Sequence, residues 1–272
     1  MDYQTLRCEQ QGPVLTLTLH RPEVRNAMSL RMVDELQNAL RHAHASFGQA
    51  DAVRVVVLQG SGGHFCAGGD LKDMAQARMQ SLQGEGTTED PIATVSAAFG
   101  QLCLAFAATP LALVAVLQGT VMGGGLGLAC VADVVLADDS VQLRLPETAM
   151  GVVPAQIAPF LVERLGYSRA RQLAVTGGRI DAPTAHAMGL VHTLVPAAQL
   201  AQALQATLAD ILACAPGALA ATKALMRRAQ KEDAAALVLQ AAALFAQAVR
   251  SPEGQEGTMA FIQKRKPQWA EP

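Results

Sequence analysis

Two glycine-rich segments constrain the fold of this chain more than any other feature: HFCAGGDLK at residues 64–72 and VMGGGLG at residues 121–127. Each follows an apolar run that predicts a buried strand, and each leads into a predicted helix. Because glycine has no Cβ, the backbone N–H groups at such a junction can approach a ligand closely. One such turn is a weak signal, but two of them could direct two N–H groups at one oxygen. The pair therefore predicts an oxyanion hole and chemistry on a carbonyl or thioester.

The two turns belong to a pattern of alternating strands and helices. Strands are predicted at residues 14–19, 53–58, 111–117, 134–137 and 190–195, and Ser29 is placed to cap the first long helix. This alternation favours right-handed βαβ crossovers and an α/β core. After residue 183 the composition shifts toward Ala, Leu and Gln, which predicts three or four C-terminal helices. We therefore divide the chain into a core at 1–196 and a helical region at 197–272.

Residues 91–132 contain no charged side chain, so hydropathy alone would indicate a membrane helix. Pro110, Gln118, Gly119 and the glycines at 123–125 divide this stretch into short pieces. We interpret it as a helix, a turn, a buried strand and a second helix inside a soluble core, because buried parallel strands are continuously apolar. A membrane partner is therefore not expected. A net charge of −2 and 4% aromatic residues also argue against a nucleic-acid partner.

The cysteines and histidines predict neither disulfides nor a metal site. The five cysteines are odd in number and lack CxxC spacing, so we interpret them as reduced residues of a cytoplasmic protein. The first twelve residues do not resemble a secretory signal. The six histidines form no ligand set, and the common nucleotide and metalloprotease motifs are absent from the sequence. No metal or separate cofactor is expected.

Glu147 is the ionisable residue that stands out, in the segment LRLPETAMG at 143–151. A carboxylate in such apolar surroundings would have a raised pKa and could exchange protons near neutral pH. It could equally be an exposed turn residue, and the sequence leaves both interpretations open. The same is true of the polar segment 81–90, which could cover an active site or be an ordinary surface loop.

Several longer segments together carry a family resemblance. They are HRPEVRNAMS at 20–29, VRVVVLQGSGGHFCAGGDLKDM at 53–74, GTVMGGGLGLACVADVVLA at 119–137, LPETAMGVVP at 145–154, ARQLAVTGGRIDAPTAHAMGLV at 170–191 and FIQKRKPQW at 261–269. In this order they resemble the crotonase (enoyl-CoA hydratase/isomerase) superfamily over nearly the whole chain. The resemblance implies a crotonase-like spiral of ββα units with a C-terminal helical trimerisation region. It also implies homotrimers or homohexamers that bind acyl-CoA, the coenzyme A being part of the substrate.

The resemblance assigns roles residue by residue. The N–H groups of Gly69 and Gly124 are the implied oxyanion donors, with Glu147 as the acid/base. Contacts to the substrate and its CoA are implied for Arg25, Ala27, Ala67, Gly68, Asp70, Leu71, Lys72, Phe261 and Lys264. The last two often act across a subunit boundary in this family. Arg25 and Lys264 could also be solvated surface charges.

The sequence departs from the family pattern at Gly127. The simplest hydratases carry one glutamate at this position and a second one twenty residues later, where this chain has Glu147. Either this one carboxylate does the proton transfer, or a water or another residue assists it. The missing side chain is expected to leave volume near the reacting carbons, which favours a branched or larger substrate.

The segment GVVPAQIAPFLVERLG at 151–166 resembles the branch that hydrates glutaconyl-type thioesters. We favour isohexenylglutaconyl-CoA of acyclic terpene catabolism, with methylglutaconyl-CoA of leucine catabolism as the alternative. Such substrates carry a second carboxylate. Arg144 is a candidate partner because it is near Glu147 in sequence, although a solvated arginine is the favoured interpretation.

The prediction is syn addition of water across the C2=C3 bond of an enoyl-CoA. An enoyl-CoA isomerase needs the same oxyanion hole and one base, so it is an alternative within enzymes. An alternative of another class is a non-catalytic acyl-CoA-binding protein, against which the presence of Glu147 argues.

Overall fold

A computed structural model describes residues 3–49, 52–83 and 90–270. Its main sheet has six strands in the order β1-β2-β3-β4-β6-β9, and a smaller sheet has three in the order β5-β7-β8. The strands of the main sheet are β1 (Leu6–Gln11), β2 (Val14–Leu19), β3 (Val55–Gly60), β4 (Ala112–Leu117), β6 (Val134–Asp138) and β9 (Thr193–Val195). Those of the small sheet are β5 (Thr120–Met122), β7 (Gln142–Arg144) and β8 (Arg179–Asp181). Neighbouring strands are parallel except for β1 with β2 and β7 with β8.

All five predicted strands are present, although the last is shorter than expected. The sequence did not predict β1, β5, β7 and β8. Three of these have only three residues, too few to show a period, and β1 is a polar edge strand.

The α-helices follow the strands in alternation through the core. They are α1 (Leu30–Ala45), α2 (Leu71–Gln83), α3 (Pro91–Ala108), α4 (Gly124–Val131), α5 (Ala158–Thr176), α6 (Ala182–Ala187), α7 (Leu200–Leu212), α8 (Pro216–Ala229), α9 (Ala234–Arg250) and α10 (Pro252–Ile262). Ser29 caps α1 as predicted, because its side chain accepts a hydrogen bond from the N–H of Met32 at 3.3 Å.

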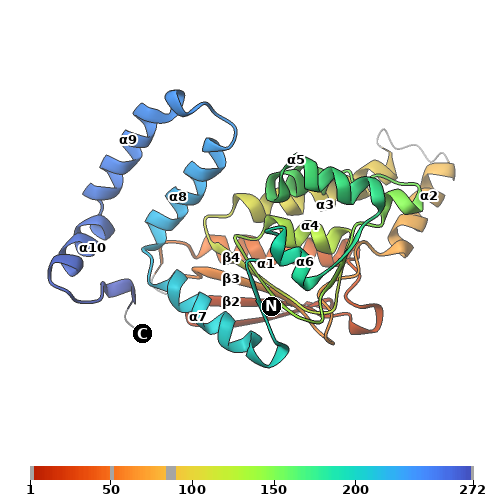
Figure 1. The fold of residues 1–272 in the computed structure, drawn as a ribbon, viewed down its shortest axis with the longest axis horizontal. Coiled ribbons are helices and arrows are strands. Elements are labelled where there is room, and N and C mark those ends of the chain that lie inside the picture. The colour runs from red at the N-terminus through yellow and green to blue at the C-terminus, as the bar shows by residue number, and fades with distance from the viewer. Residues whose placement is uncertain (1–2, 50–51, 84–89, 271–272) are drawn as a thin grey trace.

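Both faces of the main sheet are buried. Alternate residues of a strand point to opposite faces, so Val56 and Leu58 of β3 contribute to one core cluster and Val55 and Val57 to another. The second cluster includes Leu200 of α7, which lies below the strands in Figure 1, while α3, α4 and α5 lie above them. Two buried faces explain why the central strands are continuously apolar.

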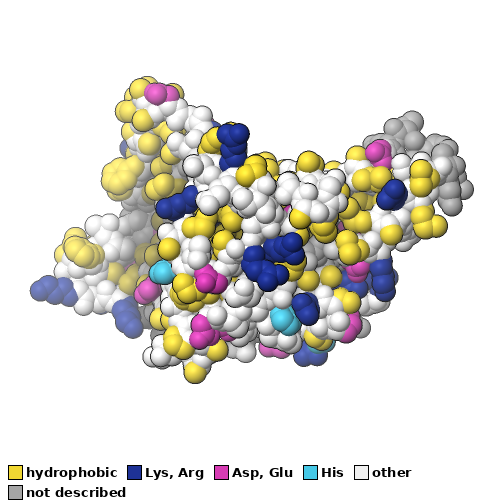
Figure 2. Space-filling model, turned by 45° about the vertical axis from the view of Figure 1, so that its right-hand side comes forward, with side chains coloured by type: hydrophobic (Ala, Val, Ile, Leu, Met, Phe, Trp, Pro, Cys, Tyr) yellow, Lys and Arg dark blue, Asp and Glu magenta, His cyan; other side chains and the backbone are white. Residues whose placement is uncertain are grey.

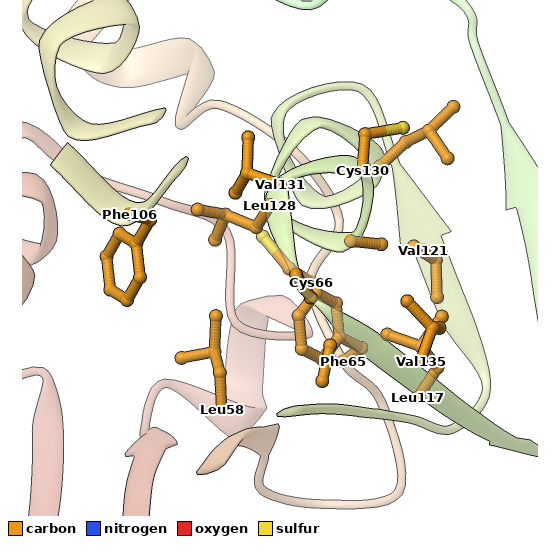
Figure 3. Packing of buried hydrophobic residues seen from close by; sticks show 14 of the residues in the cluster. Leu58, Phe65, Cys66, Phe106, Leu117, Val121, Leu128, Cys130, Val131 and Val135 are labelled. Atoms are coloured by element: carbon orange, nitrogen blue, oxygen red, sulfur yellow. The ribbon is translucent and has the colours of Figure 1, made fainter. Parts of the chain in front are cut away.

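The first glycine-rich segment begins inside the larger cluster. Phe65 and Cys66 are fully buried near the middle of the cluster, with Leu128 and Val131 of α4 close by (Figure 3). This packing holds the start of the first glycine turn against α4, the helix that follows the second glycine turn.

The uncharged stretch 91–132 forms α3, β4, β5 and α4, which confirms the predicted helix, buried strand and second helix. By length and composition alone α3 could cross a membrane, as could the bent pairs in the C-terminal region if each counts as one span. In this fold α3 packs against α1, α2 and α4, with Leu102, Cys103 and Phe106 buried.

Helices α8, α9 and α10 form an arm that projects from the core (Figure 1). Arg54 ties the base of the arm to the core, since its guanidinium donates to the carbonyls of Leu212, Cys214 and Trp269 at 2.6–2.9 Å. The arm exposes many large apolar side chains (Figure 2), namely Met226, Val238, Leu239, Phe245, Val249, Met259, Phe261 and Ile262. The helical C-terminal region is thus present, while its division from the core at residue 196 stays a prediction.

Candidate active site

The two glycine turns meet backbone to backbone. Cys66 pairs with Val121 in an isolated parallel bridge. A Cβ on Gly68 would lie 3.1 Å from the carbonyl oxygen of Met122, and one on Gly125 would lie 2.6 Å from that of Cys66. Glycine at these two positions is therefore a steric requirement of the close approach.

The N–H groups of Gly69 and Gly124 are both free. Met28 donates its N–H to the Gly68 carbonyl at 2.7 Å and accepts from the Asp70 N–H at 2.9 Å, so the Gly69 N–H points away from this pairing. Gly124 is the first residue of α4, where an N–H has no acceptor within the helix. Across residues 3–49, 52–83 and 90–270, neither N–H has a hydrogen-bond acceptor.

Gly69 and Gly124 line one cavity of about 350 Å³ together with Glu147. Its walls come from α1, α2, α3 and the segment 147–157 and are mostly apolar, with Met28, Val33, Leu71, Met74, Ile92, Val95, Phe99, Met150, Val152 and Ile157 among them. Three lining residues are acidic, and none of those the structure describes is Arg, Lys or His. Two larger hollows, of about 810 and 750 Å³, lie between the arm and the core. Neither is lined by Gly69, Gly124 or Glu147. The chemistry predicted from the sequence therefore converges on the smaller cavity.

Glu147 reaches this cavity because of the small sheet. The Gly123 N–H donates to the Arg144 carbonyl at 3.1 Å, which brings the end of β7 next to the second glycine turn. Glu147 then opens a short 3-10 turn, Glu147–Met150, and is partly buried. Its Oε1 lies 2.7 Å from where a Cβ on Gly123 would be, and its buried Oε2 has no hydrogen-bond partner in the described part of the chain.

The environment of Glu147 suits proton transfer. Burial raises the pKa of the Glu147 carboxyl because it disfavours the charged form, and a hydrogen bond from its own backbone N–H only partly opposes this effect. A carboxyl with a raised pKa and an unpaired oxygen can take a proton from a water molecule and return it to a neighbouring carbon.

Polar side chains hold the first glycine turn in shape. Asp70 accepts from the Lys72 N–H at 3.0 Å and forms an ion pair with Arg21 at 2.8 Å. Burial alone would raise the pKa of Asp70, but these hydrogen bonds and the two positive charges lower it overall. Asn26 is fully buried, and its amide contacts the backbone of Arg21, Ser61 and His64. Sequence reasoning missed Arg21 and Asn26, since nothing in a polar run shows which side chains are buried.

The structure brings some of the predicted contact residues to the cavity and leaves others outside. Asp70 and Leu71 line it beside Gly69, whereas Arg25, Ala27, Ala67, Gly68 and Lys72 are close in sequence but do not line it. Arg25 is exposed with a positive φ of 50°, and its carbonyl accepts the Ala67 N–H at 3.0 Å. The backbone of Arg25 is therefore hydrogen-bonded to the first glycine turn without reaching the cavity.

Phe261 and Lys264 do not reach the cavity of their own chain. Phe261 is 85% exposed on α10, which lies at the opposite end of the molecule from α2 in Figure 1. Lys264 follows α10 with a positive φ of 54°. Any contact of these two residues with a CoA would have to be with the CoA of another subunit.

Arg144 also does not line the cavity, which argues against a position beside the acyl chain. It belongs to β7, where it pairs with Met122 of β5 and Arg179 of β8. Nearness in sequence to Glu147 therefore does not bring Arg144 to the cavity wall.

The expectation of free volume at Gly127 is wrong. Gly127 is buried, and a Cβ there would lie 3.0 Å from Cζ of Phe99 and 3.3 Å from Cγ1 of Ile157. Phe99 comes from α3 and Ile157 precedes α5, so no local pattern around Gly127 could have revealed them.

Of the predicted loop at 81–90, residues 84–89 lie outside the described residues. Helix α2 ends at Gln83, and Asp90 caps α3 by accepting from the Ile92 N–H at 2.9 Å. Among the described residues, no three His, Cys, Asp or Glu side chains are grouped so that they could hold a metal ion.

A mixed α/β core with two facing glycine turns defines the crotonase fold class, as predicted. The family model for "Enoyl-CoA hydratase/isomerase" matches residues 9–272, and the chain belongs to this family. An enoyl-CoA hydratase/isomerase from Marinobacter aquaeolei has a similar structure, with a TM-score of 0.91, 48% identity and coverage of 98% of this chain and 99% of that one. Pseudomonas aeruginosa AtuE is also similar, with a TM-score of 0.92, 48% identity and coverage of 98% and 100%. The 2,3-dehydroadipyl-CoA hydratase of Escherichia coli (strain K12) is 33% identical over 261 residues, 95% of each chain.

These similarities make the protein an enzyme of the enoyl-CoA hydratase type, which is a hydro-lyase class. An acyl-CoA thioester fits this family as the substrate.

Proposed function

We propose that this enzyme adds water across the C2=C3 bond of an enoyl-CoA, with Glu147 as the only carboxylate that transfers protons. The observation that carries the proposal is one cavity containing a partly buried carboxyl of raised pKa and two free N–H groups. The N–H groups of Gly69 and Gly124 donate to the thioester oxygen and stabilise the enolate. One such donor is worth roughly 10²–10³ in rate.

Glu147 takes a proton from water as the water oxygen bonds to C3, and the electron pair of the double bond moves onto the thioester oxygen. The same carboxyl then returns the proton to C2 when the enolate collapses. One group acting on one face of the substrate gives syn addition. The scheme uses no metal and no cofactor besides the CoA of the substrate.

We further propose that the acyl chain is branched and of the glutaconyl type, with isohexenylglutaconyl-CoA favoured over methylglutaconyl-CoA. The apolar walls contributed by α2 and α3 support this choice, since a branched hydrocarbon needs such a surface. A relative named 2,3-dehydroadipyl-CoA hydratase also supports an acyl chain that bears a second carboxylate. Because Phe99 fills the space at Gly127, the room for the branch must come from these walls.

A turnover assay on the wild type and on the Glu147→Gln variant tests the reaction. We expect Glu147→Gln to lower kcat by about 10² or more, as is typical when a general base is removed. Glu163→Gln, on the exposed surface of α5, is the matched control and should change nothing. A Glu147→Gln rate within a few-fold of the wild type would refute the assigned role.

Two further measurements separate the alternatives. Incorporation of oxygen from labelled water at C3 identifies a hydratase, whereas an isomerase would move the double bond without incorporating it. Tight acyl-CoA binding without turnover of crotonyl-CoA, methylglutaconyl-CoA or isohexenylglutaconyl-CoA would favour the non-catalytic binding protein. The relative rates on these three thioesters decide the acyl chain.

We also propose that the arm assembles the protein into homotrimers or homohexamers in the cytoplasm. Along α8, α9 and α10 only Leu237 and Ala260 are buried within the chain, which leaves a large apolar surface for other subunits. Free cysteines fit a reducing compartment. The mass in solution, measured by light scattering against the 28.4 kDa chain, tests the assembly. A monomer would refute it.

A further inference from the structure

The cavity wall contains one neutral polar pair, Gln156 and Ser96. The Gln156 Nε2 donates to the Ser96 Oγ at 3.2 Å, and both residues line the cavity with Glu147. Gln156 comes from the segment before α5 and Ser96 from α3, so the hydrogen bond joins two separate walls. Most of the other lining side chains are apolar.

A glycine in α3 makes room for this pair. A Cβ on Gly100 would collide with the Gln156 Oε1 and lie 2.8 Å from its Cδ. Ser96 and Gly100 are four residues apart, so they lie on the same face of α3 and the amide lies across one helical turn. Glycine inside a helix is unfavourable relative to alanine. Here the steric reason for glycine is the Gln156 amide. Its oxygen lies against Gly100, and its nitrogen donates to Ser96.

This arrangement leaves hydrogen-bond donors for a ligand. The Ser96 hydroxyl accepts from Gln156, so its own O–H can donate, and the Gln156 NH₂ group has a second hydrogen. No Arg, Lys or His is found among the described lining residues. The acidic Asp70 at the same cavity is neutralised by Arg21.

We propose that Gln156 and Ser96 bind the second carboxylate of the acyl chain and so determine the preference for dicarboxylic enoyl-CoA thioesters. This inference rests on the proposed function and deepens it. Two neutral donors can each make a charge-assisted hydrogen bond to a carboxylate, and the surrounding apolar wall strengthens both. The pair takes the place of the cation that the sequence suggested at Arg144.

The test compares two thioesters that differ only in the distal carboxylate, methylglutaconyl-CoA and 3-methylcrotonyl-CoA. Gln156→Met keeps the length of the side chain and removes its donors, and Ser96→Ala removes the hydroxyl. For each variant we expect kcat/KM on methylglutaconyl-CoA to fall about 10–100-fold more than on 3-methylcrotonyl-CoA, mainly through KM. Gln172→Met, exposed on α5, is the control and should alter neither value.

Two additional variants separate a binding role from a loss of packing. Gln156→Glu keeps the size but adds a negative charge, so it should reverse the preference in favour of 3-methylcrotonyl-CoA. Gly100→Ala should displace the amide and shift the selectivity in the same direction as Gln156→Met. An equal loss on both thioesters, or an unchanged selectivity, would overturn the inference.

Binding measured by calorimetry distinguishes a failure of this inference from a failure of the proposed function. If the wild type turned over no enoyl-CoA, the hydratase proposal would fail. The inference would still hold if methylglutaconyl-CoA bound more tightly than 3-methylcrotonyl-CoA and Gln156→Met removed that difference. Equal wild-type affinities for the two thioesters would overturn it whatever the turnover.

Discussion

Gly127→Glu is the substitution that most directly tests how the cavity is packed. It introduces the carboxylate that the family resemblance places at this position. A Cβ there lies only 3.0 Å from Cζ of Phe99 and 3.3 Å from Cγ1 of Ile157, so the rest of the side chain must displace one of them. Overpacking costs about 1–3 kcal/mol. A buried carboxylate without a partner adds a penalty of about 3 kcal/mol or more, since a charged group costs more than a neutral one. Replacing glycine inside a helix returns about 1 kcal/mol.

We therefore expect Gly127→Glu to lower the free energy of unfolding by about 3–5 kcal/mol. For a chain of this size that corresponds to a fall in Tm of roughly 6–20 °C. Urea denaturation followed by circular dichroism measures the first quantity, and calorimetry measures the second. Activity should fall as well, because a displaced Phe99 would move against Gly124. The Cζ of Phe99 lies 3.5 Å from where a Cβ on Gly124 would be.

The double variant Gly127→Glu/Phe99→Ala isolates the clash. With the ring removed, the new side chain has space, so the two substitutions should destabilise the protein less than their sum by more than about 1 kcal/mol. Strict additivity, or a Gly127→Glu variant as stable as the wild type, would refute the conclusion that Phe99 and Ile157 fill this space.

Four other predictions concern the residues around the site. Because burial raises the pKa of Glu147, kcat/KM should fall at low pH with a midpoint above about 4.3, the ordinary pKa of a glutamate. A midpoint at or below that pH would contradict the assignment. The raised pKa also means that the folded state holds this proton more tightly than the unfolded chain, so Glu147→Gln should gain stability relative to the wild type as the pH rises above about 4.3 and through the raised pKa of the folded state. Gly123→Ala places a Cβ 2.7 Å from the Glu147 Oε1 and should reduce kcat by about 10². Gly12→Ala is the control for backbone strain, because Gly12 has a φ of 55° against 47° for Gly123 and a Cβ there would meet nothing within 4 Å; it should keep full activity. Asn26→Ala leaves several buried backbone groups unpaired and should lower the free energy of unfolding by about 2–4 kcal/mol in urea; a loss below 1 kcal/mol would show that the amide contacts are dispensable.

Features that depend on neighbouring residues were predictable from the sequence. The strands of the main sheet other than β1, the Ser29 cap and the helices of 91–132 follow from side-chain period and from where glycine and proline interrupt it. Gly68 and Gly125 also predicted a close approach of the backbone correctly, because a residue without a Cβ is needed where two backbones come this near. The three-residue strands of the small sheet were missed because their pairing is made with distant segments.

By itself the sequence determined the family and the two glycine turns, and it singled out Glu147 as a candidate acid/base. Only the tertiary structure decided what surrounds them. It filled the space at Gly127 with Phe99 from α3, kept Arg144 out of the cavity, and set Gln156 across Gly100. The physical reason is that local propensity depends on adjacent residues, whereas packing joins side chains that the sequence separates by tens of positions. What fills a cavity and which donors face it are therefore decided by the fold.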